Sequence, residues 1–208
     1  MINKKLPANW CWKKLSDVIA ESQPGFASGQ RDSKGVIQLR MNNVDTRGYL
    51  VWDEYLRVPA DNAMIEKFRL KSGDIVFNNT NSTELVGKSA LFTGYDEPVV
   101  YSNHFTRLRV KSNLAVPAFI AFWLISKWQA KIFEKICNRW IGQSAVKNDK
   151  LLKLEIPLPP LDEQRRIATR LKEQLAAVES ARKAAESQLA EINGLPAALL
   201  RKAFEGEM

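Results

Sequence analysis

Four short polar segments carry most of the side chains in this sequence that could recognise a ligand. They combine Arg and Lys with Asn, Gln and Ser, and they occupy residues 28–34, 40–43, 78–83 and 139–147. Arg and Lys bind guanine and phosphate, whereas the amides of Asn and Gln suit adenine. Each segment alone is also typical of an ordinary turn, so their combination is what indicates nucleic acid. The candidate DNA-binding residues are Gln30, Arg31, Lys34, Arg40, Asn42, Asn43, Asn78, Asn79, Asn81, Ser82, Lys88, Arg139, Gln143, Ser144 and Lys147.

Groups suited to catalysis or to metal binding are scarce. The one histidine is His104, and the two cysteines, Cys11 and Cys137, lie far apart in the sequence. Cys/His metal clusters, Cys-His nucleophilic pairs and a disulfide framework are therefore not expected. Gly87-Lys88-Ser89 matches the end of a phosphate-binding loop, but Ser82 stands where that loop needs its first glycine. We predict no catalytic and no metal-ligating residue.

Two alternative functions stay open at this point. Glu21, Asp32 and Lys34 have the residue types of a small metal-dependent DNA endonuclease, although Lys34 falls in a Gly- and Ser-rich segment without a supporting strand. The other alternative is a coiled-coil scaffold whose basic part binds RNA or protein. Magnesium-dependent cleavage would favour the first, and an absence of salt-sensitive duplex binding would favour the second.

The positive charge is confined to one part of the chain. The 208 residues include 31 Lys and Arg against 23 Asp and Glu, a net charge of +8. Residues 1–160 hold 23 basic and 15 acidic side chains, whereas residues 161–208 hold eight of each. A basic body favours a polyanionic partner, because neutralising phosphates releases bound counterions.

Hydropathy and cysteine usage indicate a folded, soluble, cytoplasmic protein. Hydrophobic residues make up 45% of the chain, an ordinary value for a globular protein. The longest apolar run, residues 114–125, is shorter than the roughly 20 residues of a membrane-spanning helix. Two unpaired cysteines and the lack of a signal-peptide pattern suit a reducing cytoplasm.

The elements that must position the polar segments are mainly strands. Alternating or short apolar runs bounded by turn residues predict strands at 35–41, 49–58, 75–77, 89–93, 98–101 and 105–110. A helix is expected from Pro117, with an apolar face that includes Phe119, Trp123 and Phe133.

A long helix is expected after the proline-rich segment 156–160. Asp162 is placed to cap it, Asn193-Gly194 is a stop signal, and Pro196 suits the start of a second short helix over 196–204. Helix 162–193 carries a stripe near heptad spacing, interrupted by one charge, which predicts a dimerisation face. Its residues are Leu171, Leu175, Val178, Arg182, Ala185, Leu189 and Ile192. We therefore predict an α+β fold: a mainly-β recognition domain with packed helices over 1–158, and over 159–208 a long helix forming an intermolecular, antiparallel coiled coil.

The junction segment Ile156-Pro157-Leu158-Pro159-Pro160-Leu161-Asp162-Glu163-Gln164-Arg165-Arg166-Ile167-Ala168 resembles the hallmark segment of type I restriction-modification specificity subunits. Residues 12–18, 71–77, 86–88 and 200–207 resemble other parts of the same family. The resemblance implies a non-catalytic reader of double-stranded DNA, built from a target recognition domain and a long helix. It also implies binding to methyltransferase (modification) subunits and, in a full system, to a restriction subunit with ATP-driven translocation. S-adenosylmethionine, ATP and Mg are then expected on those partner subunits, and no cofactor on this chain.

Family members typically carry two recognition domains and two helical segments, whereas this chain has one of each, so it resembles a half-length form. We expect two copies to pair their helices antiparallel and to read an inverted-repeat bipartite site. A helix of ~31 residues would span about 46 Å, or roughly 13 base pairs, and so act as a ruler between the two recognition domains.

Overall fold

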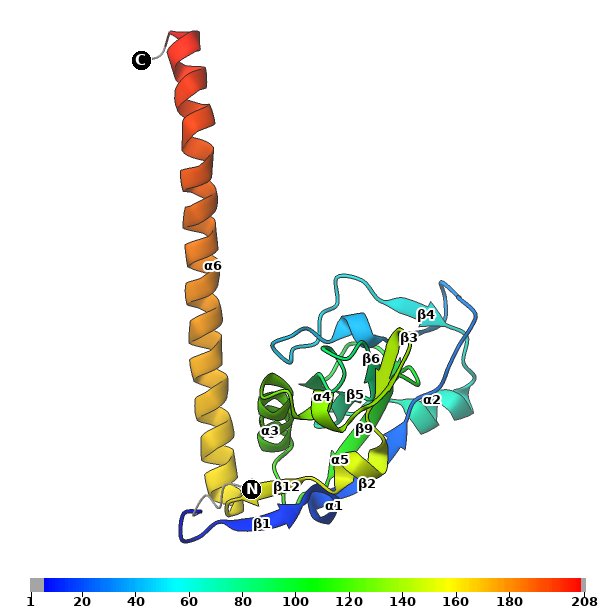
Figure 1. Ribbon diagram of the computed structural model, residues 1–208. Coiled ribbons are helices and arrows are strands. Elements are labelled where there is room, and N and C mark those ends of the chain that lie inside the picture. The colour runs from blue at the N-terminus through cyan, green and yellow to red at the C-terminus, as the bar shows by residue number, and fades with distance from the viewer. Residues whose placement is uncertain (1–5, 207–208) are drawn as a thin grey trace. The chain divides into compact units, whose positions relative to one another are not determined.

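The computed structural model describes residues 6–206 and divides into two compact units, Met1–Arg165 and Arg166–Met208 (Figure 1). The predicted boundary lies slightly earlier, after residue 158. The difference arises because the first turn of the long helix is hydrogen-bonded within the first unit, where the Gln164 side chain donates to the carbonyl oxygens of Leu114 and Pro159.

The first unit is built mainly from short strands. They are β1 (Cys11–Lys14), β2 (Ile19–Pro24), β3 (Val36–Leu39), β4 (Leu56–Val58), β5 (Ile75–Asn78), β6 (Thr80–Asn81), β7 (Ser89–Leu91), β8 (Val99–Tyr101), β9 (Phe105–Val110), β10 (Asn138–Trp140), β11 (Gln143–Ala145) and β12 (Glu155–Leu158). Its helices are α1 (Leu15–Val18), the 3-10 turn η1 (Met41–Asn43), α2 (Asn62–Phe68), α3 (Pro117–Gln129), α4 (Ile132–Ile136) and α5 (Asn148–Leu152). The predicted α+β class is confirmed.

Two sheets enclose the main core. One is antiparallel with strand order β2-β9-β5-β7, and the other has the order β4-β3-β8, in which β3 and β8 run parallel. Val76 and Phe105 of the first sheet pack with Ile37 and Leu39 of the second. On the other face of β5, Phe77 meets Phe133 of α4 edge-on, with ring centroids 5.1 Å apart. Both faces of β5 are therefore covered, which explains why all four of its residues are buried.

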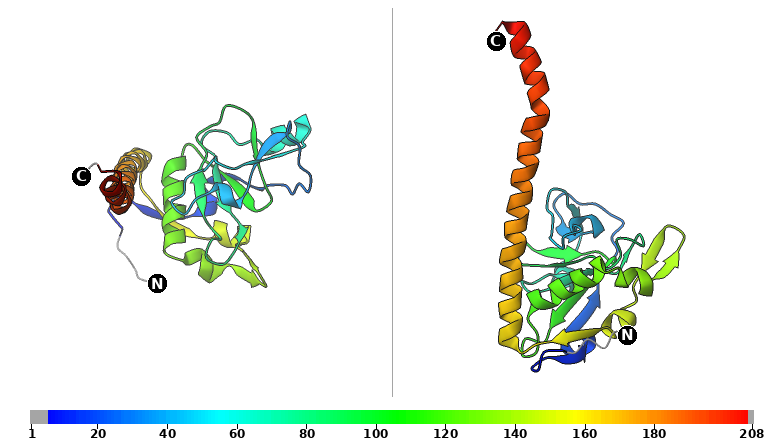
Figure 2. Two further views of the ribbon diagram at one scale, coloured as in Figure 1. Left: turned by 90° about the horizontal axis from the view of Figure 1, so that it is seen from above. Right: turned by 60° about the vertical axis from the view of Figure 1, so that its left-hand side comes forward.

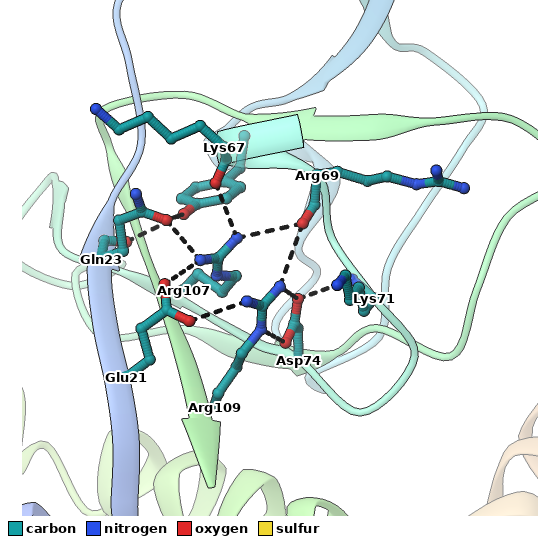
Figure 3. Close-up of polar contacts among 9 residues, drawn as sticks. Glu21, Gln23, Lys67, Arg69, Lys71, Asp74, Arg107 and Arg109 are labelled. Carbon is teal, nitrogen blue, oxygen red and sulfur yellow. Dashed lines mark hydrogen bonds and ion pairs between the residues drawn. The ribbon is translucent and has the colours of Figure 1, made fainter. Parts of the chain in front are cut away.

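A charge network around the buried Arg107 ties β2, β9 and the turn before β5 to the end of α2 (Figure 3). The Arg107 side chain is 2% exposed, and it pairs with Glu21 and donates to the carbonyl oxygens of Lys67 and Arg69. Arg109 joins Glu21 to Asp74 through nitrogen–oxygen distances of 2.9 and 2.7 Å. Because a buried guanidinium is tolerated only when it is paired and hydrogen-bonded, this network specifies the position of α2.

Local interactions override two of the sequence predictions in this unit. The predicted strand 49–58 is reduced to β4, because the carbonyl oxygens of Val51 and Glu54 accept hydrogen bonds from the Asn43 side chain instead of joining a ladder. The helix predicted from Pro117 is two helices, α3 and α4, separated at Lys131, which has a left-handed φ of 57°.

The proline-rich junction is itself a strand. β12 pairs antiparallel with β1 in a two-stranded sheet, from Cys11 opposite Leu158 to Lys14 opposite Glu155. A proline cannot donate a ladder hydrogen bond, so Pro157 fits a strand that has a neighbour on one side only. This pairing joins the two ends of the first unit just before the long helix begins.

The second unit is the continuation of one helix, α6 (Leu161–Glu205). This helix has 45 residues, and its first five belong to the first unit. It starts one residue before the expected cap, so Asp162 lies in its first turn. The predicted end at Asn193 and the separate helix over 196–204 are wrong, because α6 runs through Gly194 and Pro196. A glycine costs a helix only about 1 kcal/mol relative to alanine, and a proline is accommodated by a bend. Figure 2 shows such a bend toward the C-terminal end of α6. Within residues 6–206, no helix is long and apolar enough to cross a membrane.

Candidate nucleic-acid interface

The fold brings the four polar segments together through a chain of contacts. Residues 28 and 40–42 line a cavity of about 250 Å³, together with Gln38 and residues 102–104 from the turn between β8 and β9. That turn is bonded to the third segment, because the carbonyl oxygen of His104 accepts from the backbone N–H of Asn79 at 2.9 Å and from the Asn78 side chain at 3.0 Å. The third segment in turn pairs with the fourth in the sheet β10-β11-β6. We call residues 27–34, 40–43, 78–83, 102–104 and 138–147 the loop surface.

Two arginines make one part of the loop surface strongly positive. Burial, together with the nearby positive charge of Arg31, lowers the pKa of Arg40 below its ordinary value. Among the described residues, neither Arg31 nor Arg40 forms an ion pair with an acidic side chain. Two adjacent cations without an acidic partner attract an anion, and a nucleic-acid phosphate has the required charge and acceptor oxygens.

Ten of the predicted contact residues keep some solvent exposure. Exposed or half-buried are Gln30, Arg31, Lys34, Arg40, Asn42, Asn79, Ser82, Arg139, Gln143 and Lys147. Asn79 is partly committed, because its side chain donates to the carbonyl oxygen of Asn103 and to the Thr106 hydroxyl. Within residues 6–206, the other nine have no comparable set of internal side-chain partners, although Arg139 donates to the carbonyl oxygen of Glu134 at 3.0 Å.

The remaining five predicted residues are buried and serve the fold instead. Asn43, Asn78, Asn81, Lys88 and Ser144 are each at most 8% exposed. The Asn81 side chain donates to the Asn78 side chain at 2.6 Å, and the Ser144 hydroxyl lies 2.8 Å from that of Thr83. In this structure these side chains are buried and hold the loops in place. We therefore withdraw them as contact candidates.

Lys88 is the clearest case of a positioning role. Its ammonium group donates to the carbonyl oxygens of Met41 and Val44, and burial lowers its pKa even though the charge of Asp45 acts in the opposite direction. The preceding Gly87 has a φ of 93°, and a Cβ there would lie 2.3 Å from the Phe133 ring. Gly87-Lys88-Ser89 is therefore a packing turn, and Lys88 anchors the segment that carries Arg40 and Asn42.

Comparison with known proteins identifies the fold and the family. The model of the type I restriction modification DNA specificity domain matches residues 7–186, which include the junction segment 156–168. The chain belongs to this family. The resemblance drawn from the sequence is thereby confirmed.

Individual relatives agree with this assignment. The type I restriction enzyme MjaVIII specificity subunit of Methanocaldococcus jannaschii is 30% identical over 177 residues, which cover 81% of this chain and 40% of the relative. The EcoKI specificity subunit of Escherichia coli is 24% identical over 220 residues, covering 100% of this chain and 47% of the relative. The chain thus spans about half the length of the curated relatives it matches.

Solved structures show the same fold. A chain from a structural study of complex assembly and conformational transition of the type I R-M system superimposes with a TM-score of 0.75 at 20% identity. The match covers 100% of this chain and 48% of that chain. The HsdS subunit of Thermoanaerobacter tengcongensis gives a TM-score of 0.64 at 21% identity over 100% of this chain and 48% of that chain.

The geometry of this specificity domain does not support the endonuclease alternative. Glu21 is held by Arg107 and Arg109, while the carboxylate of Asp32 accepts the backbone N–H of Lys34 at 2.9 Å, as in an ordinary turn. Among residues 6–206, no group of three His, Cys, Asp or Glu side chains is placed to hold a metal ion. Each of the proposed nuclease carboxylates therefore has a structural role.

Several residues of the specificity domain's loop surface escaped the sequence analysis. Ser102, Asn103 and His104 form a turn between two predicted strands. Their polar side chains, between two apolar runs, are the sequence signal that would have added this turn to the predicted surface. Gln38 on strand β3 lies outside the loop surface but lines the same cavity; it is buried, and its Oε1 has no hydrogen-bond partner among the described residues. Trp140 and Ile141 fall within the predicted polar segment 139–147, and the structure places them, exposed, at the tip of the β10–β11 hairpin.

Proposed function

We propose that this chain reads DNA sequence for a type I restriction-modification system and has no catalytic role of its own. In this proposal the loop surface contacts one half of a bipartite duplex target. The observation that carries it is the merging of four polar segments into one surface, in a chain that belongs to a DNA specificity family. Arg31, Arg40 and Lys34 would neutralise phosphates, while Asn42 and Gln143 have the amide chemistry that reads adenine.

The chemistry of restriction and modification would reside on other chains. We propose that this chain binds methyltransferase subunits and, in a complete system, a restriction subunit that translocates DNA. S-adenosylmethionine, ATP and Mg would then be bound by those partners, and the assembly would act in the cytoplasm. The names of the relatives support this arrangement, since they are specificity subunits of type I restriction enzymes.

We propose further that α6 pairs with α6 of a second copy. Four residues of the predicted stripe, Leu175, Val178, Leu189 and Ile192, are between 39% and 65% exposed. They form an apolar row, and removing such a row from water by pairing is favourable. The row continues beyond the expected helix end, because Leu195 and Leu199 are also more than half exposed. Arg182, the charged residue within the row, is bonded along its own helix to Glu179 and Glu186, which raises its pKa. Its positive charge is therefore balanced within its own helix.

DNA binding tests the central claim. The full chain, co-purified with a type I methyltransferase subunit, should bind duplex DNA, and the logarithm of its binding constant should fall linearly with the logarithm of salt concentration. Genomic methylation by this complex should map to one bipartite sequence. A complex that methylates DNA with the same pattern when this chain is omitted would refute the proposal, as would failure of the chain to bind duplex DNA at low salt.

A further inference from the structure

The β10–β11 hairpin presents an unusual apolar tip. Ile141 is fully exposed and Trp140 is 59% exposed, whereas the strands below them are polar. Figure 2, in its right-hand view, shows this hairpin projecting from the rest of the first unit. Large apolar side chains at such a site cost solubility, so they indicate contact with a partner.

The hairpin is rigid at its root and free at its tip. The strands are in register from Asn138 opposite Ala145 to Trp140 opposite Gln143, so the turn consists of Ile141 and Gly142 alone. Gly142 has a φ of 76°, which glycine adopts without steric cost. The tight turn leaves Ile141 little freedom to fold back onto the body.

The root is anchored from both strands. β11 pairs with β6, and the backbone N–H of Val146 donates to the carbonyl oxygen of Asn79 at 2.9 Å. On the other strand, the Lys150 ammonium donates to the carbonyl oxygen of Ile136 at 2.8 Å and to the Asn138 side chain at 2.9 Å. The apolar tip is therefore held in a fixed direction before any partner arrives.

The surroundings of the tip select a polyanion. Residues 127–153 contain seven Lys or Arg and two Asp or Glu, a net charge of +5 in 27 residues. Arg139 precedes Trp140 and is exposed, and Lys147 follows the hairpin and is exposed. An apolar tip flanked by cations matches the chemistry of the DNA double helix, whose charged phosphates border stacked apolar bases. The hairpin is part of the loop surface, and its strand β11 pairs with β6 of the third polar segment, so the same partner is expected for both.

We infer that Trp140 and Ile141 form a wedge that inserts between base pairs of the bound duplex, opening one base step while Arg139 binds an adjacent phosphate. This inference rests on the proposed function and deepens it. Side chains that enter the stack partly separate neighbouring base pairs and kink the duplex, and the protein then contacts more of the bent DNA. The wedge supplies affinity through stacking, and its contribution does not depend on salt.

Two variants separate the contribution of stacking from that of charge. Trp140→Ser combined with Ile141→Ser removes the wedge, and Arg139→Gln removes the flanking charge. Trp12→Ser is the matched control, because Trp12 is 48% exposed but lies on β1, which pairs with β12 and not with the hairpin. Thermal melting of each full-length variant confirms that the fold is retained.

Fluorescence anisotropy with two labelled duplexes measures the effect. One duplex is an intact random-sequence pool, and the other carries an unpaired adenine bulge, where the base stack is already open. The wild type should bind the bulged duplex more tightly. The double variant should lose this preference and about tenfold in affinity, with an unchanged salt dependence. Arg139→Gln should instead reduce the slope of log affinity against log salt by about one.

Each other outcome overturns the inference. Wild-type binding that is salt-sensitive but equal for the two duplexes, or a double variant that binds like the Trp12→Ser control, refutes the wedge and leaves the proposed function intact. A double variant that binds DNA normally but no longer co-purifies with the methyltransferase subunit makes the tip a protein contact. A wild type that binds neither duplex at low salt refutes the wedge and the proposed function together.

Discussion

Arg40 and Lys88 are both basic residues of the region that forms the loop surface, but their environments give them different roles. Arg40 lines the cavity together with Asn42, and its guanidinium forms no ion pair among the described residues. The Lys88 ammonium is buried and bonded to two backbone carbonyl oxygens. Arg40 is therefore available to an anion, whereas Lys88 fixes the backbone on which Arg40 stands.

Replacing Arg40 should affect DNA binding without affecting the fold. We expect Arg40→Ala to weaken binding to every duplex sequence and to lower the slope of log affinity against log salt by about one, because one phosphate contact is lost. Anisotropy over a series of salt concentrations measures this. Arg69→Ala is the control, since Arg69 is also exposed but lies outside the loop surface. Equal losses in both variants would mean that Arg40 contributes only general charge.

Replacing Lys88 should reduce stability without changing the salt dependence of DNA binding, the opposite of what is expected for Arg40. Lys88→Met leaves the carbonyl oxygens of Met41 and Val44 without their donor, and an unsatisfied buried polar group costs about 1–3 kcal/mol. We expect a lower free energy of unfolding in urea, together with weaker DNA binding at an unchanged salt slope. A reduced salt slope with undiminished stability would instead place Lys88 in contact with phosphate.

Glu21 should make stability depend on acid pH. Burial alone would raise its pKa, but the hydrogen bonds and charges of Arg107 and Arg109 outweigh burial and lower the pKa below the ordinary value of 4.5. The folded state therefore gains stability from the ionised carboxylate above that value, and loses it as the pH falls toward the lower folded pKa. Glu21→Gln should be less stable at neutral pH and lose less stability on acidification.

Urea unfolding at neutral and at acid pH measures this difference. Glu66→Gln on α2 is the control, because Glu66 is exposed and forms no part of the Arg107 network. If Glu21→Gln and Glu66→Gln lose stability in parallel with the wild type as the pH falls, the carboxylate of Glu21 does not stabilise the folded state.

At the scale of elements, the sequence predicts best where a pattern is local. The strands at 75–77, 89–93, 98–101 and 105–110 are confirmed as β5, β7, β8 and β9, because short apolar runs between turn residues suffice to define them. The pairing of β1 with β12 was not predicted, since it joins residues up to 147 positions apart and leaves no local signal. The helix α2 was also missed, although Asp61 caps it by accepting the N–H of Met64 at 2.7 Å.

The candidate site could likewise be predicted from the sequence only in its local features. Residue type located the polar segments, but it could not separate Asn42, which is exposed, from the adjacent Asn43, which is buried and bonded to Val51 and Glu54. Asn satisfies backbone groups in turns as readily as it reads a base. Only the path of the backbone decides between these uses, and that path depends on distant anchors such as Lys88.

The continuity of α6 can be tested at Gly194 and Pro196. A Cβ built on Gly194 would meet no heavy atom within 4 Å apart from its chain neighbours and the helix's own backbone, so Gly194→Ala should stabilise the helix by about 1 kcal/mol. Pro196→Ala restores a backbone donor and should contribute up to about 3 kcal/mol. Hydrogen exchange should then slow at residues 193–199 in both variants. Exchange that stays fast at 193–195 would support two separate helices.

At the scale of the whole molecule, the exposed row on α6 predicts a dimer. Leu189→Glu with Ile192→Glu places two charges in the row and should convert a dimer into a monomer in size-exclusion chromatography with light scattering, because burying unpaired charge is costly. Ser187→Glu is the control, since residue 187 lies on the opposite side of the helix from residue 189. A strict monomer for the wild type at micromolar concentration would refute self-pairing.

The length of α6 should set the distance between the two half-sites on DNA. At 1.5 Å per residue the helix of 45 residues spans about 68 Å, or roughly 20 base pairs, which is longer than the sequence estimate because α6 does not end at Asn193. Deleting one heptad, residues 179–185, preserves the apolar row and shortens the helix by about 10 Å. Antiparallel pairing should then bring the two half-sites about three base pairs closer without changing their sequence. Methylation-site sequencing with the co-expressed methyltransferase subunit reads both quantities. Deleting two residues instead rotates the part of the row beyond the deletion by about 200° and should abolish pairing. An unchanged spacer in the heptad variant, or an altered half-site sequence, would show that α6 does not set the distance between the half-sites.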